Sequence, residues 1–212
     1  GGYRPGSGRK RTKPIENLIN IKLNSIQKMM LQEIGDGDHI FNVQRGIKLV
    51  IDLEPTIKDL PMSKALNTIA MKVLSGIGGS SGALFGTLFM TLAKGKDIDN
   101  GIDFNKTVEI FYDAVQAVKM RGKADIGEKT MMDVLIPVAN TLKDLNQKKI
   151  GMETILSKVI EVAEEGMLST KELIATKGRA SFLGERAKGH IDPGARSSQI
   201  MITTVCESVI NS

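Results

Sequence analysis

Apolar residues along this chain recur at the spacing of an α-helix. Between positions 104 and 118, five apolar residues follow one another at steps of three or four positions, which places them on one helix face. Strict alternation of apolar and polar residues, which is typical of a half-buried strand, is scarce throughout the sequence. The pattern therefore predicts an all-α protein. The residues of the clearest stripe are Phe104, Val108, Phe111, Val115 and Val118.

Glycine and proline divide this helical pattern into eight segments. We expect Pro137 to kink the sixth helix and Gly166 to mark a weak point in the seventh, because neither residue favours a helix interior. The predicted helices span residues 14–34, 41–53, 62–75, 82–95, 104–121, 128–146, 151–177 and 197–211.

The connections between these helices fall into two classes that alternate along the chain. Segments 35–39, 76–82, 121–127 and 178–195 are rich in glycine and in residues that bind ions or phosphates. The other connections, 54–61, 95–103 and 146–150, read as ordinary polar turns. If successive helices run up and down, every connection of the first class lies at the same end of the bundle. The sequence thus predicts a functional site at that end.

The first of these loops carries two carboxylates and a histidine. Asp36 and Asp38 are separated by one glycine, so both can turn toward a hard cation such as Mg²⁺. His39 and Asn42, at the start of the next helix, are placed to donate to phosphate oxygens, helped by the helix dipole. The alternative interpretation is a polar turn that caps a helix, since Asp-Gly is a common turn dipeptide.

The second loop, 76–82, opens a helix with glycine and serine, whose amides and hydroxyls suit an anion. It is not a Walker loop, because no lysine follows, and no strand precedes it as a Rossmann loop requires. A flexible linker capped by Ser80 or Ser81 is the alternative. The alternative for the third loop is a solvated charged turn, which such a run usually is. The fourth loop has the length of a functional lid. Both histidines of the chain, His39 and His190, lie in these loops.

Composition adds limits on size and compartment. A chain of 212 residues with 41% hydrophobic and 25% charged residues suits one domain, which we place at 14–212. The single cysteine, Cys206, excludes an internal disulfide and lies in an apolar stretch where we expect it to be buried. No apolar run reaches the roughly 18 residues of a membrane span, and no signal-peptide core is seen at the start. We therefore expect a cytoplasmic protein without a membrane segment.

The positive net charge of +5 comes from a short segment. Residues 1–13 contain five of the 29 basic residues and no acidic one, so the remainder has 24 basic and 24 acidic residues. We read 1–13 as a disordered, glycine-rich basic tail. The neutral body and the scarcity of aromatic residues disfavour a nucleic-acid-binding protein.

Four segments together resemble one known family. They are G-D-G-D-H at 35–39, G-G-S-S-G-A-L-F-G-T at 78–87, R-G-K-A-D-I-G-E-K-T-M at 121–131, and G-R-A-S-F-L-G-E-R-A-K-G-H-I-D-P-G-A at 178–195. They are similar to the signatures of the nucleotide-binding L subunit of phosphotransferase-system-dependent dihydroxyacetone kinase, which is equivalent to the C-terminal domain of ATP-dependent dihydroxyacetone kinases. The similarity runs from about residue 14 to the end, and the fourth segment is specific to this family.

The resemblance implies an eight-helix antiparallel barrel that holds ADP or ATP and two Mg²⁺ ions in loops at one end. Asp36 and Asp38 would bind Mg²⁺. The phosphates would be contacted by His39, Asn42, Ser80 and Ser81, the nucleotide by Gly122, Met131 and Arg179, and a closing loop would comprise Asp192, Pro193 and Gly194.

The resemblance also implies a phosphotransferase activity with two protein partners. A phosphohistidine on a phosphotransferase subunit would convert bound ADP to ATP, and the phosphoryl group would pass to dihydroxyacetone held on a second kinase subunit. This chain would then need no catalytic nucleophile of its own, because positioning and charge neutralisation are what phosphoryl transfer chiefly requires. A homodimer and a complex with these partners both remain open.

Three departures from the family pattern leave an alternative function open. Leu31 stands where the family has a third metal-binding aspartate, and leucine cannot ligate Mg²⁺; Glu33 is a poor substitute at that helical spacing. Ile40 replaces the glycine that follows the loop histidine, and residues 1–34 match poorly. The alternative is a catalytically weakened paralogue that acts as a nucleotide-sensing regulatory module.

Overall fold

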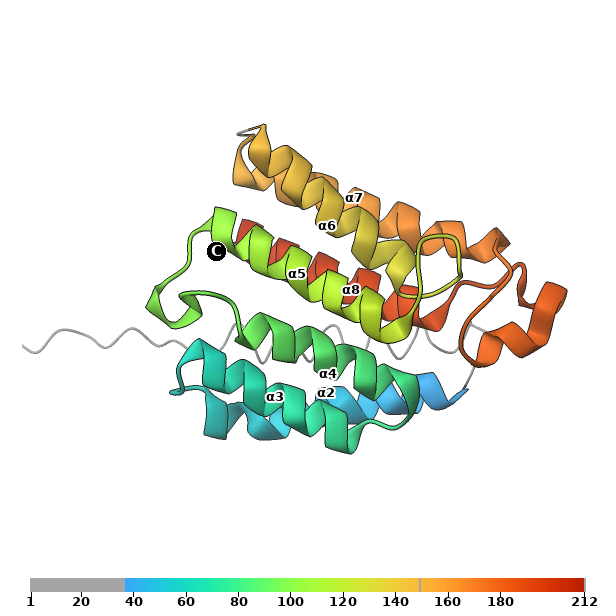
Figure 1. Cartoon of the computed structure of the whole chain (residues 1–212), viewed down its shortest axis with the longest axis horizontal. Helices are drawn as coiled ribbons and strands as arrows, with labels where there is room; N and C mark the ends of the chain where they lie inside the picture. The colour runs from blue at the N-terminus through green and yellow to red at the C-terminus, as the bar shows by residue number, and fades with distance from the viewer. Residues whose placement is uncertain (1–36, 149, 212) are drawn as a thin grey trace, which may run out of the picture. The chain divides into compact units, whose positions relative to one another are not determined.

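The structure, a computed structural model, describes residues 37–148 and 150–211 (Figure 1). The predicted basic tail, 1–13, and the predicted first helix, 14–34, lie outside these residues, as do Leu31, Glu33 and Asp36. Within the described ranges the chain forms helices and loops without any strand, so the all-α prediction is confirmed. No helix of the described part is both long and apolar enough to cross a membrane.

Seven α-helices and three 3₁₀ segments make up the described part of the chain. The α-helices are α2 (Gly37–Ile57), α3 (Met62–Gly76), α4 (Gly79–Ala93), α5 (Phe104–Gly122), α6 (Met132–Gln147), α7 (Met152–Ser169) and α8 (Pro193–Ile210). The 3₁₀ segments are η1 (Ile98–Asn100), η2 (Thr170–Glu172) and η3 (Arg179–Ala187).

Successive helices run in opposite directions and pack against one another from α2 to α8 (Figure 1). Helix α8 also contacts α2, so the first and last described helices meet. The α3–α4, α5–α6 and α7–α8 connections and the start of α2 lie at one end of this bundle (Figure 1). The plain polar turns lie at the other end, as the alternation of loop classes predicts.

Aliphatic side chains from α4 to α8 form the core. The largest side chains that are essentially inaccessible to solvent include Leu88, Met132, Leu135, Ile155 and Met167. Cys206 is buried in the same cluster, as its apolar surroundings in the sequence predict, and burial raises the pKa of its thiol to about 11. Burial of this kind is the main source of stability in a helical bundle.

Helices α7 and α8 differ from the prediction at the end that carries the site. Helix α7 ends at Ser169 instead of continuing to 177, and Leu173 has an extended backbone. The Thr170 hydroxyl donates to the carbonyl of Met167 at 2.7 Å, a local side-chain bond that competes with continued helix. Helix α8 begins at Pro193 instead of 197, because the Asp192 carboxylate accepts from the Ala195 amide at 2.7 Å and caps the helix.

Helices α6 and α7 lie close together at Gly166. Pro137 lies inside α6 and has no N–H, so the carbonyl of Asp133 lacks its usual helical donor. A Cβ atom built on Gly166 would lie 2.3 Å from that carbonyl oxygen, which shows how directly the glycine faces it. The sequence predicts a weak point at Gly166; in the structure α7 is continuous there, and the glycine permits close packing.

Candidate functional site

Three helix N-termini meet at the end of the bundle that carries the glycine-rich loops. His39, in the first turn of α2, has Nδ1 3.0 Å from the Ser81 hydroxyl of α4 and Nε2 3.2 Å from the Ser197 hydroxyl of α8. One imidazole therefore joins the beginnings of α2, α4 and α8. Each helix N-terminus has backbone N–H groups without helical acceptors and a partial positive charge. Three of them at one place favour a bound anion.

Hydrogen-bond donors and acceptors around His39 define its orientation. The Ser197 hydroxyl donates its single proton to the carbonyl of Gly194 at 3.0 Å, so its oxygen accepts from Nε2–H of His39. In the neutral imidazole, Nδ1 is then the acceptor for the Ser81 hydroxyl. The ring is thus held between two serines, one of which, Ser197, the sequence analysis did not identify.

The start of α4 is open to solvent and lacks a side-chain cap. Gly78 precedes the helix with an extended backbone and makes no capping hydrogen bond, and Gly79 has a φ of 68°, which favours glycine. Gly78, Gly79 and Ser80 are exposed, so the first amides of α4 are accessible. A Cβ on Gly78 would lie 3.7 Å from Oδ1 of Asn42, which places that predicted site residue beside this loop.

The third and fourth loops also meet, as predicted. A Cβ on Gly194 would lie 3.5 Å from both the amide nitrogen and the Cβ of Met131, so these two predicted site residues face each other. Gly122 is the last residue of α5, and a Cβ there would lie 3.2 Å from Leu84 of α4. Arg179 begins η3, but its side chain, like that of Asp38, is outside the described part of the structure.

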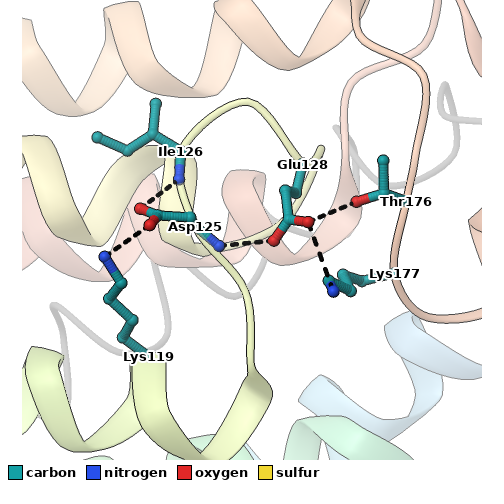
Figure 2. Close-up of polar contacts among 6 residues, drawn as sticks. All are labelled: Lys119, Asp125, Ile126, Glu128, Thr176 and Lys177. Carbon is teal, nitrogen blue, oxygen red and sulfur yellow. Dashed lines mark hydrogen bonds and ion pairs between the residues drawn. The ribbon is translucent and has the colours of Figure 1, made fainter.

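A network of exposed polar contacts links the third loop to the segment after α7. The Glu128 carboxylate accepts from the Asp125 amide at 2.7 Å and the Thr176 hydroxyl at 2.9 Å, with the Lys177 ammonium at 3.5 Å (Figure 2). These contacts, led by the amide of Asp125, lower the pKa of Glu128. Asp125 in turn pairs with Lys119 of α5 at 2.7 Å (Figure 2). The third loop is therefore structured, not merely solvated.

Asp133 is a buried carboxylate that the sequence analysis missed. Its two oxygens accept from the amides of Gly127 at 2.6 Å and Thr130 at 2.7 Å, so it organises the third loop from the first turn of α6. The signal in the sequence is an acidic residue three positions after Thr130, the spacing of a helix cap. The prediction that this helix starts at 128 placed Asp133 inside the helix and hid that signal.

Among the described residues at this end of the bundle, the Asp192 carboxyl has the pKa that is shifted most. Burial raises its pKa to about 7, and the Asp133 carboxylate acts in the same direction. The amides of Ala195 and Gly194 and the ammonium of Lys129 act in the opposite direction. A carboxyl that titrates near neutral pH beside a cluster of loops is typical of a functional site.

The metal ligands predicted from the sequence, in contrast, are not among the described side chains. Among residues 37–148 and 150–211, no group of three or more histidine, cysteine, aspartate or glutamate side chains is arranged to hold a metal ion. The two predicted ligands, Asp36 and Asp38, fall outside the described side chains. Their paired carboxylates suit Mg²⁺ chemically, and the magnesium site stays a prediction.

The chain is similar in sequence to known proteins. The family model described as the DAK2 domain matches residues 33–207. The ADP-binding subunit DhaL of the PEP-dependent dihydroxyacetone kinase of Escherichia coli is 39% identical over 171 residues, which cover 81% of each chain. The corresponding subunit of PEP-dependent dihydroxyacetone kinase 1 of Listeria innocua is 37% identical over 184 residues, 85% of each chain.

The fold is similar to that of a solved kinase structure. The crystal structure of the dihydroxyacetone kinase from C. freundii, in complex with AMP-PNP and Mg²⁺, superposes with a TM-score of 0.66 at 21% identity. The match covers 98% of this chain and 37% of that one. The relatives are named as kinases, which are phosphotransferases. The chain belongs to the DAK2-domain family.

Proposed function

We propose that this chain is the ADP-binding subunit of a dihydroxyacetone kinase that depends on the phosphotransferase system. The observation that carries the proposal is the meeting of three helix N-termini around His39, with the uncapped amides of α4 beside it. A polyphosphate has the charge that such a site stabilises. The 36–39% identity to named ADP-binding kinase subunits supports the choice of ligand and activity.

The site residues follow from the family pattern and from the loops that the fold brings together. Asp36 and Asp38 would hold Mg²⁺. The phosphates would lie against His39, Asn42, Ser80 and Ser81; the rest of the nucleotide would lie near Gly122, Met131 and Arg179, under the segment Asp192, Pro193 and Gly194. The contacts of His39 with Ser81 and of Gly194 with Met131 support this grouping.

In this proposal, the chain contributes binding and electrostatics and supplies no nucleophile. The N-termini of α2, α4 and α8 would stabilise negative charge on the phosphates, and His39 would be held in place by Ser81 and Ser197. The bound nucleotide would accept a phosphoryl group from a phosphohistidine partner and supply it to dihydroxyacetone on a second subunit. Mg²⁺, when bound, would neutralise phosphate charge.

The first test is calorimetric titration of ADP with and without Mg²⁺, on the wild-type protein and on Leu31→Asp. Tight binding by the wild type that requires Mg²⁺ supports the proposal, because Asp36 and Asp38 then suffice. Phosphoryl transfer to dihydroxyacetone should follow when both partner subunits are added. Absence of transfer at saturating Mg²⁺ and nucleotide, with active partners, would refute the kinase function.

Leu31, in place of an expected aspartate, favours a second candidate. In that case the chain is a nucleotide-sensing regulatory module that binds a partner without chemistry. Weak ADP binding by the wild type, restored by Leu31→Asp, would support it. A titration in which no partner binds in a nucleotide-dependent way would count against it.

We further propose that residues 14–212 form the nucleotide-binding domain and that it works in the cytoplasm with its partner subunits or as a homodimer. Residues 1–13 would be a basic tail outside the site. Deletion of 1–13 should therefore leave the ADP affinity unchanged, and sedimentation of the chain alone would distinguish a monomer from a homodimer.

A further inference from the structure

Lys129 is a buried cation at the junction of three segments. Its side chain is only 4% exposed, and its backbone has a φ of 59°, which is uncommon for a residue with a side chain. The ammonium donates to the carbonyl oxygens of Thr170 and His190, each at 2.5 Å. It therefore connects the third loop to the C-terminal end of α7 and to the fourth loop.

The surroundings explain why an ammonium is stable there. Thr170 is the C-cap of α7, so its carbonyl lies at the negative end of that helix dipole. Burial lowers the pKa of Lys129, and the carboxylates of Asp192, Glu172 and Asp133 oppose this effect. Lysine is seldom buried without such partners. The position thus combines a costly buried charge with a dedicated set of acceptors.

The fourth loop is attached at the same point by its backbone. The Asp192 amide donates to the Thr170 hydroxyl at 3.0 Å, and the Gly189 amide donates to the Lys171 carbonyl at 2.8 Å. These two bonds fix residues 189–192 on the end of α7. The Lys129 ammonium then ties the third loop to this assembly, at the carbonyl of His190.

Both ends of this connection are within two residues of proposed nucleotide contacts. Lys129 precedes Met131 by two positions, and His190 precedes Asp192 by two positions. The hydrogen bond to His190 therefore joins the two loops beside the place where Gly194 faces Met131. A loop that is free to open would leave the nucleotide between these residues more often exposed to water.

We propose that Lys129 is a positioning residue that holds the loop 178–195 closed against the loop 121–131 at the nucleotide site. The part of this inference that concerns ADP rests on the function proposed above. The attachment of the two loops does not, because it is a property of the protein without nucleotide.

The test compares Lys129→Met, which keeps the length of the side chain and removes the ammonium, with Lys171→Met. The matched control removes a lysine charge next to Thr170, but from an exposed side chain. Three quantities are measured on each protein: the unfolding midpoint, the ADP affinity with Mg²⁺, and amide hydrogen exchange without nucleotide.

We expect Lys129→Met to accelerate exchange at the amides of Gly189, Asp192 and Ala195, while α3 and α4 exchange as in the wild type. The ADP dissociation constant should rise about 10-fold to 100-fold, which corresponds to a variant whose loop is closed in about 10% to 1% of molecules. Lys171→Met should match the wild type in all three measurements.

Unchanged exchange at residues 188–195 in Lys129→Met would overturn the inference, as would a uniform increase over all helices, which indicates a general loss of stability. If Lys129→Met does not fold, Lys129→Arg decides, because arginine retains a cation at this position. We then expect amide exchange as in the wild type and an ADP dissociation constant within about threefold of the wild-type value. Faster exchange or weaker ADP binding than this overturns the inference. Wild-type protein that fails to bind ADP refutes the proposed function, while the exchange experiment still decides whether Lys129 holds the loops.

Discussion

The close approach of α6 and α7 at Gly166 allows a quantitative prediction for Gly166→Ala. The added Cβ would lie 2.3 Å from the carbonyl oxygen of Asp133 and 3.2 Å from the Cα of Val134. A carbon and a carbonyl oxygen normally approach to about 3.3 Å, so the shortfall is about 1 Å. The three nearest atoms all belong to the backbone of α6, so a change of side-chain rotamer cannot relieve the contact.

The expected change in the free energy of unfolding is the sum of two opposing effects. Overpacking a buried contact costs about 1–3 kcal/mol, and a rigid backbone obstacle favours the upper part of that range. Replacing glycine by alanine inside a helix recovers about 1 kcal/mol. We therefore expect Gly166→Ala to lower the free energy of unfolding by about 2 kcal/mol, which corresponds to about 4–8 °C in the unfolding midpoint for a chain of this size.

Gly46→Ala is the matched control for this experiment. Gly46 is also buried inside a helix, and its Cβ would lie 2.3 Å from an atom of Ile77. That atom is the terminal methyl of a side chain, which can rotate away, so we expect a stability within about 1 kcal/mol of the wild type. Urea denaturation followed by circular dichroism gives both values. If Gly166→Ala is as stable as Gly46→Ala, the packing argument is wrong.

Three further predictions concern the loop end. Asp192→Asn keeps the helix cap but removes a carboxyl whose pKa is raised from 3.8 to about 7. The wild type should therefore lose stability as pH rises from about 4 to about 7, and urea denaturation at several pH values should show a shallower loss in the variant. Ser197→Ala removes the acceptor of Nε2–H of His39, so ring ¹⁵N shifts should show a changed tautomer ratio and stability should fall by about 1 kcal/mol. Asp133→Ala leaves the amides of Gly127 and Thr130 without acceptors, which should cost about 2–4 kcal/mol in the same denaturation assay; a loss below 1 kcal/mol would contradict the role of Asp133.

The helices that the sequence predicts best are those with both an apolar stripe and a clear boundary. The predicted helices 62–75 and 104–121 match α3 and α5 to within one residue. Pro61 immediately precedes α3, and the Asp103 carboxylate caps α5 by accepting from the Lys106 amide at 2.8 Å. Both signals are local, so reading the chain residue by residue is enough to find them.

The end of α7 depends on residues that are distant in the sequence. No glycine or proline lies between Ser169 and Gly178, and the helical pattern continues to 177. The structure ends the helix where Thr170 bonds to Met167 and where Lys129, 41 positions earlier, binds the Thr170 carbonyl. The start of α8 is a different case, because Asp192 followed by Pro193 is a helix-start signal that the sequence analysis assigned to the loop.

The candidate site was predicted as a set of loops but not as a set of contacts. The alternation of glycine-rich and plain connections placed the loops at one end, which Figure 1 shows for the described helices. The bond between His39 and Ser197 joins residues 158 positions apart, and nothing local to either residue predicts it. The burial of Lys129 was missed for the same reason, since charged residues in a loop are usually solvated. Asp133 was missed because the predicted helix was started too early, at 128.

The distribution of contacts in the bundle also bears on how the protein folds. Most helix packing joins neighbours in the sequence, which favours rapid formation of the helical pairs. The hydrogen bonds between distant residues, such as those of His39 and Lys129, lie at the loop end and require the longest segments of chain to close. The loop end should therefore assemble last, and a ligand that recognises it would select molecules whose last helix is already in place.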